Sequence, residues 1–395
     1  MDHEADHEAG HAARRHALVA LLKERQEVGE PVAAAMLAVP RHLFLPDMDP
    51  EEAYRDEAIV TKRDDEGRPI SSSSQPAIMA AMLDQLGVAP GHRVLEIGAG
   101  TGYNAALLAH LVVPGGHVVS VDIDDDVVAG ARRHLSAAGT SSPVEVVCAD
   151  GAAGWPERAP YDRMIATVGV WDLAPAWLEQ LKDDGRLVVP LDLRGMQVSV
   201  AMERSGGHWV SRSVVPCGFM RMRGPFAGPE VTLVLSRDPD LVLALPEPRE
   251  IGDVLTALDA ASTDIATKVD MSSPAMGTGL SLWLALHEPR WCVLSGKLGR
   301  GYGVTAGIVE GDGIALLAAE RTLVARGHGA GGARLAAELA GHIGAWDQAG
   351  RPEAEDLRIE AYEAPTPTPG PGPRTGPDAG AVIGKRHTKL VLSFP

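Results

Sequence analysis

The 395-residue sequence has few cysteines, no excess of basic residues and no long apolar run. Its three cysteines, Cys148, Cys217 and Cys292, have no paired spacing, so neither a disulfide framework nor a zinc site is indicated, and we expect no metal. Thirty-six basic against fifty-three acidic side chains give a formal charge of −17. Tight binding to nucleic acid needs a basic face, so we expect no nucleic-acid partner.

Membrane and secretory segments are also missing from the sequence. No apolar run reaches the roughly 18 residues that a membrane span needs, and the acidic start MDHEADHEAGH is the opposite of a signal peptide. We therefore expect a cytoplasmic protein with no membrane contact. The hydrophobic content of 45% is ordinary for a globular protein and provides for a sizeable core.

The order of helical and strand patterns predicts three segments. Residues 1–50 read as a helical segment preceded by a disordered acidic tail. Over residues 51–236 short apolar strands alternate with helices, which is typical of a doubly wound α/β sheet buried on both faces. Residues 240–395 read as an additional α+β domain with a Pro/Gly-rich loop at 364–380. We expect the apolar strand after that loop to dock onto a sheet, because an unpaired apolar strand favours aggregation.

A glycine-rich turn, EIGAGTG, lies between an apolar strand and a helix. Glycines permit positive φ and close approach of the backbone to a ligand, and the helix that follows offers free N–H groups. The turn alone is a weak signal, since dinucleotide-binding dehydrogenases use a similar one. Asp122 ends the next strand, where it can accept hydrogen bonds from ribose hydroxyls, and Asp150-Gly151 closes the third. Together with Glu96 before the glycines, these residues favour S-adenosylmethionine over a nicotinamide cofactor. A purely structural turn with surface acids is the alternative.

The run SSSSQP, a helix, VLEIGAGTGYNAALLA, VVSVDID, ADG, APYDRMIAT and LEQLKDDGRLVVP resembles the protein-L-isoaspartate O-methyltransferase family over residues ~55–225. The resemblance implies the class I S-adenosylmethionine-dependent methyltransferase fold, with a Rossmann-like doubly wound sheet. It also implies methyl transfer to a side-chain carboxylate in a peptide, with S-adenosylhomocysteine as product. Ser74 matches the serine that family members place between cofactor and substrate carboxylate, which makes it the expected catalytic residue.

The resemblance also assigns the remaining site residues. The expected cofactor-binding residues are Ser73, Ser74, Glu96, Gly98, Ala99, Gly100, Thr101, Gly102, Asp122, Ile123, Asp150 and Gly151. The expected substrate-binding residues are Gln75, Thr167, Val168, Gly169 and Trp171. A carboxylate is already an anion at pH 7, so no general base is needed. The tasks left to the enzyme are orientation and exclusion of water. The other serines, residues 71–73, are expected to form a flexible loop without a catalytic role.

Two departures from the family pattern bear on the substrate. Repair enzymes carry a Thr-Ala-Ala-like stretch after the fourth strand, whereas residues 166–172 read ATVGVWD, and about 155 residues follow the catalytic domain. These features and CGFMRMRG at 217–224 resemble methyltransferases that act with ribosomally made, modified peptides, in lanthipeptide systems of the FxLD type and in graspetide and lasso-peptide systems. In those relatives the ester of an Asp is attacked by the following amide, giving an aspartimide that can open to isoaspartate.

Our favoured interpretation from sequence is therefore methylation of an Asp in a modified ribosomal precursor peptide, the ester then cyclising to aspartimide. The alternative is isoaspartyl methylation in the repair of damaged proteins. Two further alternatives are a non-catalytic cofactor-binding protein and a nucleic-acid methyltransferase, which the acidic balance disfavours. Cys217 is expected to be a buried structural thiol, because methyl transfer needs no covalent intermediate. The oligomeric state stays open.

Overall fold

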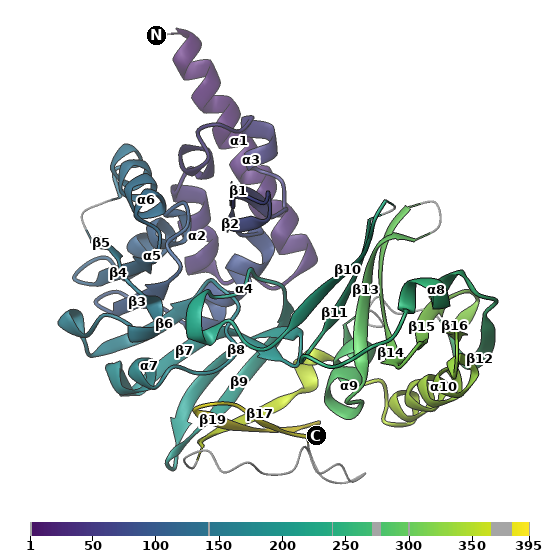
Figure 1. Ribbon diagram of the computed structural model, residues 1–395. Coiled ribbons are helices and arrows are strands. Elements are labelled where there is room, and N and C mark those ends of the chain that lie inside the picture. Colours follow the sequence, from purple (N-terminus) through teal and green to yellow (C-terminus); the bar gives the residue numbers. More distant parts are fainter. Residues whose placement is uncertain are drawn as a thin grey trace.

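The structure is a computed structural model that describes residues 2–140, 143–238, 240–270, 278–298, 301–364 and 381–394. Its two large β-sheets each form the centre of one lobe, and Figure 1 shows the lobes side by side. Among the helices in these ranges, none combines the length and the hydropathy needed to cross a bilayer.

The N-terminal segment is helical and leads into a hairpin. Its elements are α1 (Asp2–Arg25), α2 (Glu30–Ala38), η1 (Arg41–Phe44), α3 (Pro50–Ala53), β1 (Ile59–Arg63) and β2 (Pro69–Ser73). The expected disordered tail is wrong for residues 2–10, which form the first turns of α1. Ala and Glu are good helix formers, and the apolar residues Leu18, Val19 and Leu22 anchor the second half of the helix in the core. The expected flexible loop at residues 71–73 is also wrong, because these serines pair with β1.

The first sheet contains the predicted Rossmann-like part. Its parallel strands are β3 (Arg93–Ile97), β4 (His117–Asp122), β5 (Val144–Cys148), β6 (Tyr161–Ala166) and β7 (Leu181–Leu193). The helices of this part are α4 (Pro76–Leu86), α5 (Tyr103–Val112), α6 (Asp125–Ala137) and α7 (Pro175–Gln180). Val94 and Leu95 alternate in direction and are both fully buried, because elements cover both faces of the sheet. The predicted class I methyltransferase fold, with mixed α/β content and extra C-terminal strands, is confirmed.

The strand order places β3 between β6 and β4, so the connections run in opposite directions on the two sides of β3. In open α/β sheets ligands bind outside the carboxyl ends of the strands at such a point. Antiparallel β8 (Met196–Ser205) and β9 (His208–Cys217) extend the sheet beyond β7. The sheet thus locates the site next to the glycine-rich turn that follows β3.

The second sheet is entirely antiparallel and has the order β10-β11-β13-β14-β15-β16-β12. Its strands are β10 (Val231–Arg237), β11 (Asp240–Leu245), β12 (Thr263–Asp270), β13 (Trp291–Leu298), β14 (Gly301–Glu310), β15 (Gly313–Ala319) and β16 (Thr322–His328). Its helices are α8 (Val254–Asp259), α9 (Gly279–His287) and α10 (Gly332–Gln348). Leu335, Leu339, Ile343 and Trp346 of α10 are fully buried and form much of this lobe's core.

The sheets do not follow the expected division into a first domain that ends at residue 236 and a second that covers residues 240–395. The disagreement occurs at both ends of the second domain. β10 belongs to the second sheet, although the first domain was expected to extend to residue 236. The strands β17 (Arg358–Glu363), β18 (Ala381–Gly384) and β19 (Thr388–Ser393) return to the first sheet, where β17 pairs with β9. Their inward residues Ile359, Ala361, Leu390 and Leu392 pack in the same core as the Rossmann-like strands, which explains the return. The final strand therefore docks onto a sheet, as its apolar pattern predicts. Residues 365–380 of the expected loop lie outside the described residues.

Candidate active site

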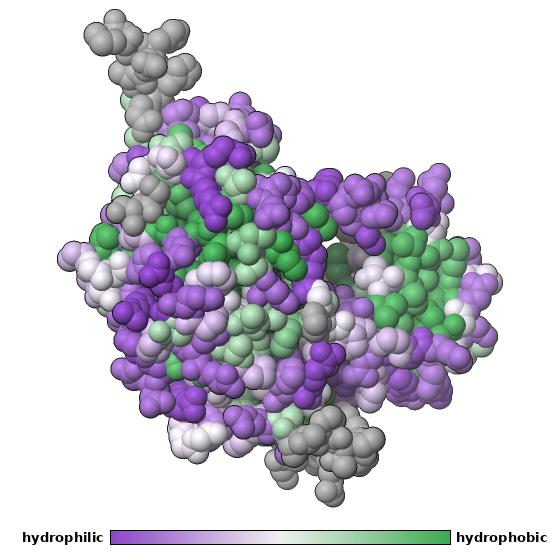
Figure 2. Space-filling model, turned by 60° about the vertical axis from the view of Figure 1, so that its left-hand side comes forward, coloured by the Kyte–Doolittle hydropathy of each residue, from purple (hydrophilic) through white to green (hydrophobic). Residues whose placement is uncertain are grey.

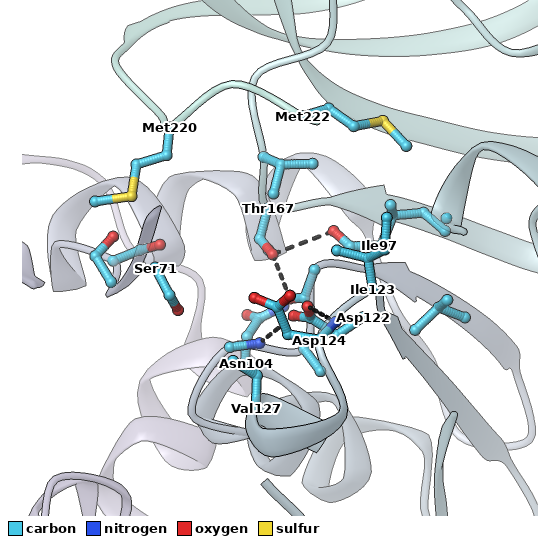
Figure 3. Close-up of a pocket in the computed structure, with 18 of the residues that line it drawn as sticks. Ser71, Ile97, Asn104, Asp122, Ile123, Asp124, Val127, Thr167, Met220 and Met222 are labelled. Atoms are coloured by element: carbon cyan, nitrogen blue, oxygen red, sulfur yellow. Dashed lines mark hydrogen bonds between the residues drawn. The ribbon is translucent and has the colours of Figure 1, made fainter. Parts of the chain in front are cut away.

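An open cavity lies at the carboxyl ends of β3, β4 and β6, with about 930 Å³ of empty space when the open solvent at its mouth is included. Figure 3 shows Met220 and Met222 on one side of the cavity, with Asp122 and Asp124 on the other and Thr167 between them. The lining consists of Ile70, Ser71, Ser72, Ser73, Ser74, Met79, Ile97, Gly98, Ala99, Gly100, Thr101, Tyr103, Asn104, Val121, Asp122, Ile123, Asp124, Val127, Asp150, Gly151, Thr167, Val168, Met220, Arg221, Met222 and Arg223.

The glycine-rich turn forms the floor of this cavity. Gly98 has a φ of +100°, and a Cβ there would lie 2.7 Å from Thr167 Oγ1. The Thr167 hydroxyl instead donates a hydrogen bond to the Gly98 carbonyl oxygen at 2.7 Å. Gly100 and Gly102 also have positive φ values. Gly102 does not line the cavity, and a Cβ on it would press on the backbone of Ala131 in α6. The turn is therefore glycine-rich both for its backbone conformation and for close packing.

Asp122 at the end of β4 fits the expected role of ribose acceptor. Its Oδ2 accepts the Gly100 N–H at 3.0 Å, and its Oδ1 accepts the Asp124 N–H at 3.3 Å. Each carboxylate oxygen has a second lone pair, so the carboxylate can accept further bonds from ligand hydroxyls. The next residue, Ile123, lines the same cavity with 47% of its surface exposed. An exposed apolar side chain beside a carboxylate suits a flat base joined to a sugar.

Asp150 and Gly151 form the far end of the cavity. Asp150 begins a short 3₁₀ turn by accepting the Ala152 N–H at 2.9 Å. Gly151 is held from behind, because the Trp177 indole N–H donates to its carbonyl oxygen at 2.7 Å. A Cβ on Gly151 would lie 2.6 Å from Ile97 Cγ2. A larger residue at this position would therefore displace the cavity wall.

Glu96 does not contact the cavity, contrary to its expected role in cofactor binding. Its side chain is fully buried behind the turn, where it accepts hydrogen bonds from Asn104 Nδ2 at 2.8 Å and from Ser120 Oγ. Burial raises the pKa of Glu96 to about 7, against the opposing effect of these two hydrogen bonds. Asn104, by contrast, does line the cavity. Glu96 thus acts on the site only through the side chain that it orients.

The serine segment lines the cavity with Ser73 and Ser74. Ser73 is buried, and its Oγ has no hydrogen-bond partner among the described residues. Ser74 is half-buried and lines the same wall. A buried hydroxyl without a partner is costly unless a ligand or water satisfies it. Gln75 is not at the cavity, contrary to expectation, because its Nε2 donates to the Asp56 carboxylate at 3.1 Å.

The expected substrate wall at residues 167–171 is only partly exposed to the cavity. Thr167 and Val168 line it, whereas Gly169 and Trp171 do not. Gly169 instead forms a backbone bridge to the opposite rim: its N–H donates to the Met220 carbonyl oxygen, and its own carbonyl oxygen accepts the Met222 N–H, both at 2.8 Å. The Trp171 ring lies behind this bridge, with Lys385 Nζ 5.2 Å from its centroid. Gly169 and Trp171 therefore support the wall from behind.

The rim at residues 220–223 contains cavity-lining residues that were not assigned from sequence. Met220, Arg221, Met222 and Arg223 all line the cavity, and the CGFMRMRG segment was the available signal for them. Arg223 Nη2 donates to Asp124 at 2.7 Å, and Lys62 of β1 donates to the same carboxylate at 3.1 Å. Burial opposes ionisation of Asp124, but these two cations hold its pKa below the usual range. Two separate segments are thus tied to one carboxylate at the cavity's edge.

The residues present fit S-adenosylmethionine as the bound methyl donor. Asp122 provides a carboxylate for ribose, the glycine-rich turn allows close backbone approach, and Ser73 presents a buried hydroxyl that has no other partner among the described residues. Over the same part of the chain, no three His, Cys, Asp or Glu side chains are placed to hold a metal ion. Cys217, expected to be a buried thiol, is only partly buried, and desolvation raises its pKa to about 12.

Comparison with known proteins decides the family. The sequence profile described as Protein-L-isoaspartate(D-aspartate) O-methyltransferase matches residues 13–224, more than half of the chain. The chain belongs to this family. Two similar relatives, both named Protein-L-isoaspartate O-methyltransferase, come from Hyperthermus butylicus and Thermotoga maritima. The first is 37% identical over 229 residues, covering 56% of this chain and 92% of the relative. The second is 35% identical over 243 residues, covering 61% and 74%.

A solved structure named protein-L-isoaspartate O-methyltransferase extends the likeness beyond the catalytic part. It is 27% identical with a TM-score of 0.52, and the match covers 88% of this chain and 96% of that one. The chain is an S-adenosylmethionine-dependent protein carboxyl O-methyltransferase of this family's type. Since the likeness includes much of the region after residue 224, the extra length alone does not separate this protein from isoaspartate methyltransferases.

Proposed function

We propose that this protein methylates the free carboxylate of isoaspartyl residues in polypeptides. The observation that carries the proposal is the placement of Ser73 and Ser74 on one cavity together with the glycine-rich turn and Asp122. The family relatives bear the matching name, and the family profile covers the whole cavity-forming part. The proposal favours the repair-type alternative over the precursor-peptide interpretation favoured from sequence.

The bound cofactor supplies a sulfonium methyl group, and the chain supplies the environment of the reaction. An ionised carboxylate needs no base to attack, so the side chains orient and shield it. In this proposal the Ser74 hydroxyl holds one carboxylate oxygen while the other attacks. Met220, Met222 and Val168 provide apolar surface that excludes water and strengthens this hydrogen bond. Thr167 keeps the wall and the glycine-rich turn in register through its bond to the Gly98 carbonyl oxygen.

A second candidate substrate is an Asp in a modified precursor peptide, whose ester cyclises to aspartimide. The feature that favours it is the substrate wall, where Val168 and Gly169 replace the family's small alanines and Trp171 fills the space behind. The backbone bridge from Gly169 to Met220 also joins this wall to the opposite rim. This candidate predicts that linear isoaspartyl peptides are poor substrates.

The deciding experiment offers two linear hexapeptides that differ only in an isoaspartyl or an aspartyl linkage. We expect mass spectrometry to show methylation of the isoaspartyl peptide alone, and Ser74→Ala to lower kcat at least ten-fold while S-adenosylhomocysteine binding stays within two-fold. Failure of both peptides, together with methylation of a macrocyclic or otherwise modified Asp peptide, would favour the second candidate. Loss of cofactor binding in Ser74→Ala would instead make that serine structural.

A further inference from the structure

The strand β10 forms one free edge of the second sheet. It pairs with β11 along its length, and the topology places no described strand on its other side. In Figure 1 this strand forms the margin of its lobe that faces the first sheet. Figure 2 shows a hollow between the two lobes. A row of backbone N–H and C=O groups is thus available beside the Rossmann-like part.

The two edges of this sheet are built differently. The opposite edge strand, β12, carries Asp264, Lys268 and Asp270, charges of the kind that protect sheet edges from pairing with other chains. β10 has the sequence VTLVLSR and carries no charge before Arg237. Its central residue Val234 is apolar and 58% exposed. An uncharged, β-branched edge is the kind to which an extended peptide adds as a further strand.

The start of β10 is tied directly to the cavity. Glu230 immediately precedes the strand and forms an ion pair with Arg221, a residue of the cavity rim. Arg221 also binds Asp192 at 2.8 Å, and its backbone is bridged to Gly169 of the substrate wall. Arg221 therefore fixes the end of the free edge to the rim of the cavity.

We propose that the polypeptide substrate adds to β10 as an extended strand and from there places its carboxylate in the cavity. This inference rests on the proposed function, since it supplies the docking surface for the same reaction. Backbone hydrogen bonds to β10 depend little on side chains, so they suit a substrate recognised by its linkage and not by its sequence. The second lobe then acts as a docking surface for substrate polypeptide.

The test uses the full chain and two isoaspartyl peptides, a hexapeptide and a 20-residue peptide with flanks rich in Val and Thr. We expect the long peptide to have a KM at least five-fold lower than the hexapeptide. Val234→Lys, which places a charge on the free edge, should remove this advantage and leave the hexapeptide unchanged. The matched control is Val304→Lys, because Val304 is 67% exposed and lies on β14, which β11 and β13 separate from β10.

Thr232→Lys on the same strand provides a second edge variant, and circular dichroism shows which variants fold. Equal effects of Val234→Lys and Val304→Lys, or no effect of either edge variant, would overturn the proposal. A wild-type dimer that Val234→Lys dissociates in sedimentation velocity would also overturn it, since the edge would then pair two copies. If neither peptide is methylated, the proposed function fails. Anisotropy of the labelled long peptide, with and without the edge charge, still decides whether β10 binds it.

Discussion

The Thr388 hydroxyl donates a hydrogen bond of 2.6 Å to the carboxylate of Asp172, across 216 positions of sequence. Asp172 is fully buried directly after Trp171, and it also accepts the backbone N–H of His387. From the same turn, Lys385 donates to the Asp192 carbonyl oxygen at 2.8 Å and contacts the Trp171 ring. The hairpin at the end of the chain is therefore part of the support behind the substrate wall.

We expect Thr388→Val to weaken peptide binding more than cofactor binding. Valine has a similar shape but removes one donor from a buried carboxylate, which costs about 1–3 kcal/mol of unfolding free energy. The KM for an isoaspartyl peptide should rise several-fold, with the Kd for S-adenosylhomocysteine within two-fold. Urea unfolding, steady-state kinetics and calorimetry measure the three quantities. Thr322→Val at the start of β16 in the second sheet is the control, and an equal loss in both variants would contradict the assigned support.

Asp122→Ala should weaken the binding of S-adenosylhomocysteine by about ten-fold or more. A hydrogen bond to a charged group is worth about 1.5–3 kcal/mol, and the Gly100 N–H also loses its acceptor. Asp126→Ala provides the control, because Asp126 is exposed and pairs only at the surface with Lys62. Isothermal titration calorimetry measures both. An unchanged Kd for Asp122→Ala would refute the ribose assignment.

Because the pKa of Glu96 is raised, the free energy of unfolding should fall as the pH rises from 4.5 to 7. Its pKa is about 7 in the folded protein and near 4.5 in the unfolded chain, so the folded state binds more protons between these values. The stabilisation is complete below pH 4.5 and is lost as the pH rises through 7. From pH 5.5 to 8 wild type should lose about 2 kcal/mol that Glu96→Gln retains. Urea unfolding of both proteins at the two pH values tests this, and parallel pH profiles would contradict it.

Local patterns were enough to predict that the glycine-rich turn and Asp122 lie together at one cavity. β3 and β4 are apolar runs of strand length, and the residue types that follow them, glycines and Asp122, are set by backbone geometry and hydrogen bonding. These features lie within about 30 consecutive residues, so periodicity and turn chemistry capture them. Glu96 shows the limit of this approach, because a sequence does not reveal that Asn104 and Ser120 enclose its carboxylate.

The substrate side depends on pairings that no local pattern contains. Sheet edges accept any strand of suitable face, so the choice between the two sheets for β17 and β19 is settled by which core their apolar faces fill. Lys385 and Thr388 reach Trp171 and Asp172 only because of that choice. The same holds for Gln75, whose partner Asp56 precedes the β1–β2 hairpin.

Gly98→Ala should abolish cofactor binding. Gly91→Ala is the control that separates backbone strain from the contact with Thr167. Both Gly98 and Gly91 have positive φ values, +100° and +84°, so alanine at either strains the backbone by roughly 1–2 kcal/mol. A Cβ on Gly91 meets nothing within 4 Å, whereas one on Gly98 lies 2.7 Å from Thr167 Oγ1. Both variants should therefore lose stability in urea unfolding, Gly98→Ala more than Gly91→Ala, and only Gly98→Ala moves Thr167 off the Gly98 carbonyl oxygen and distorts the cavity floor. Calorimetric binding of S-adenosylhomocysteine that is equally weak in both variants would show that backbone strain, and not the contact with Thr167, governs the turn.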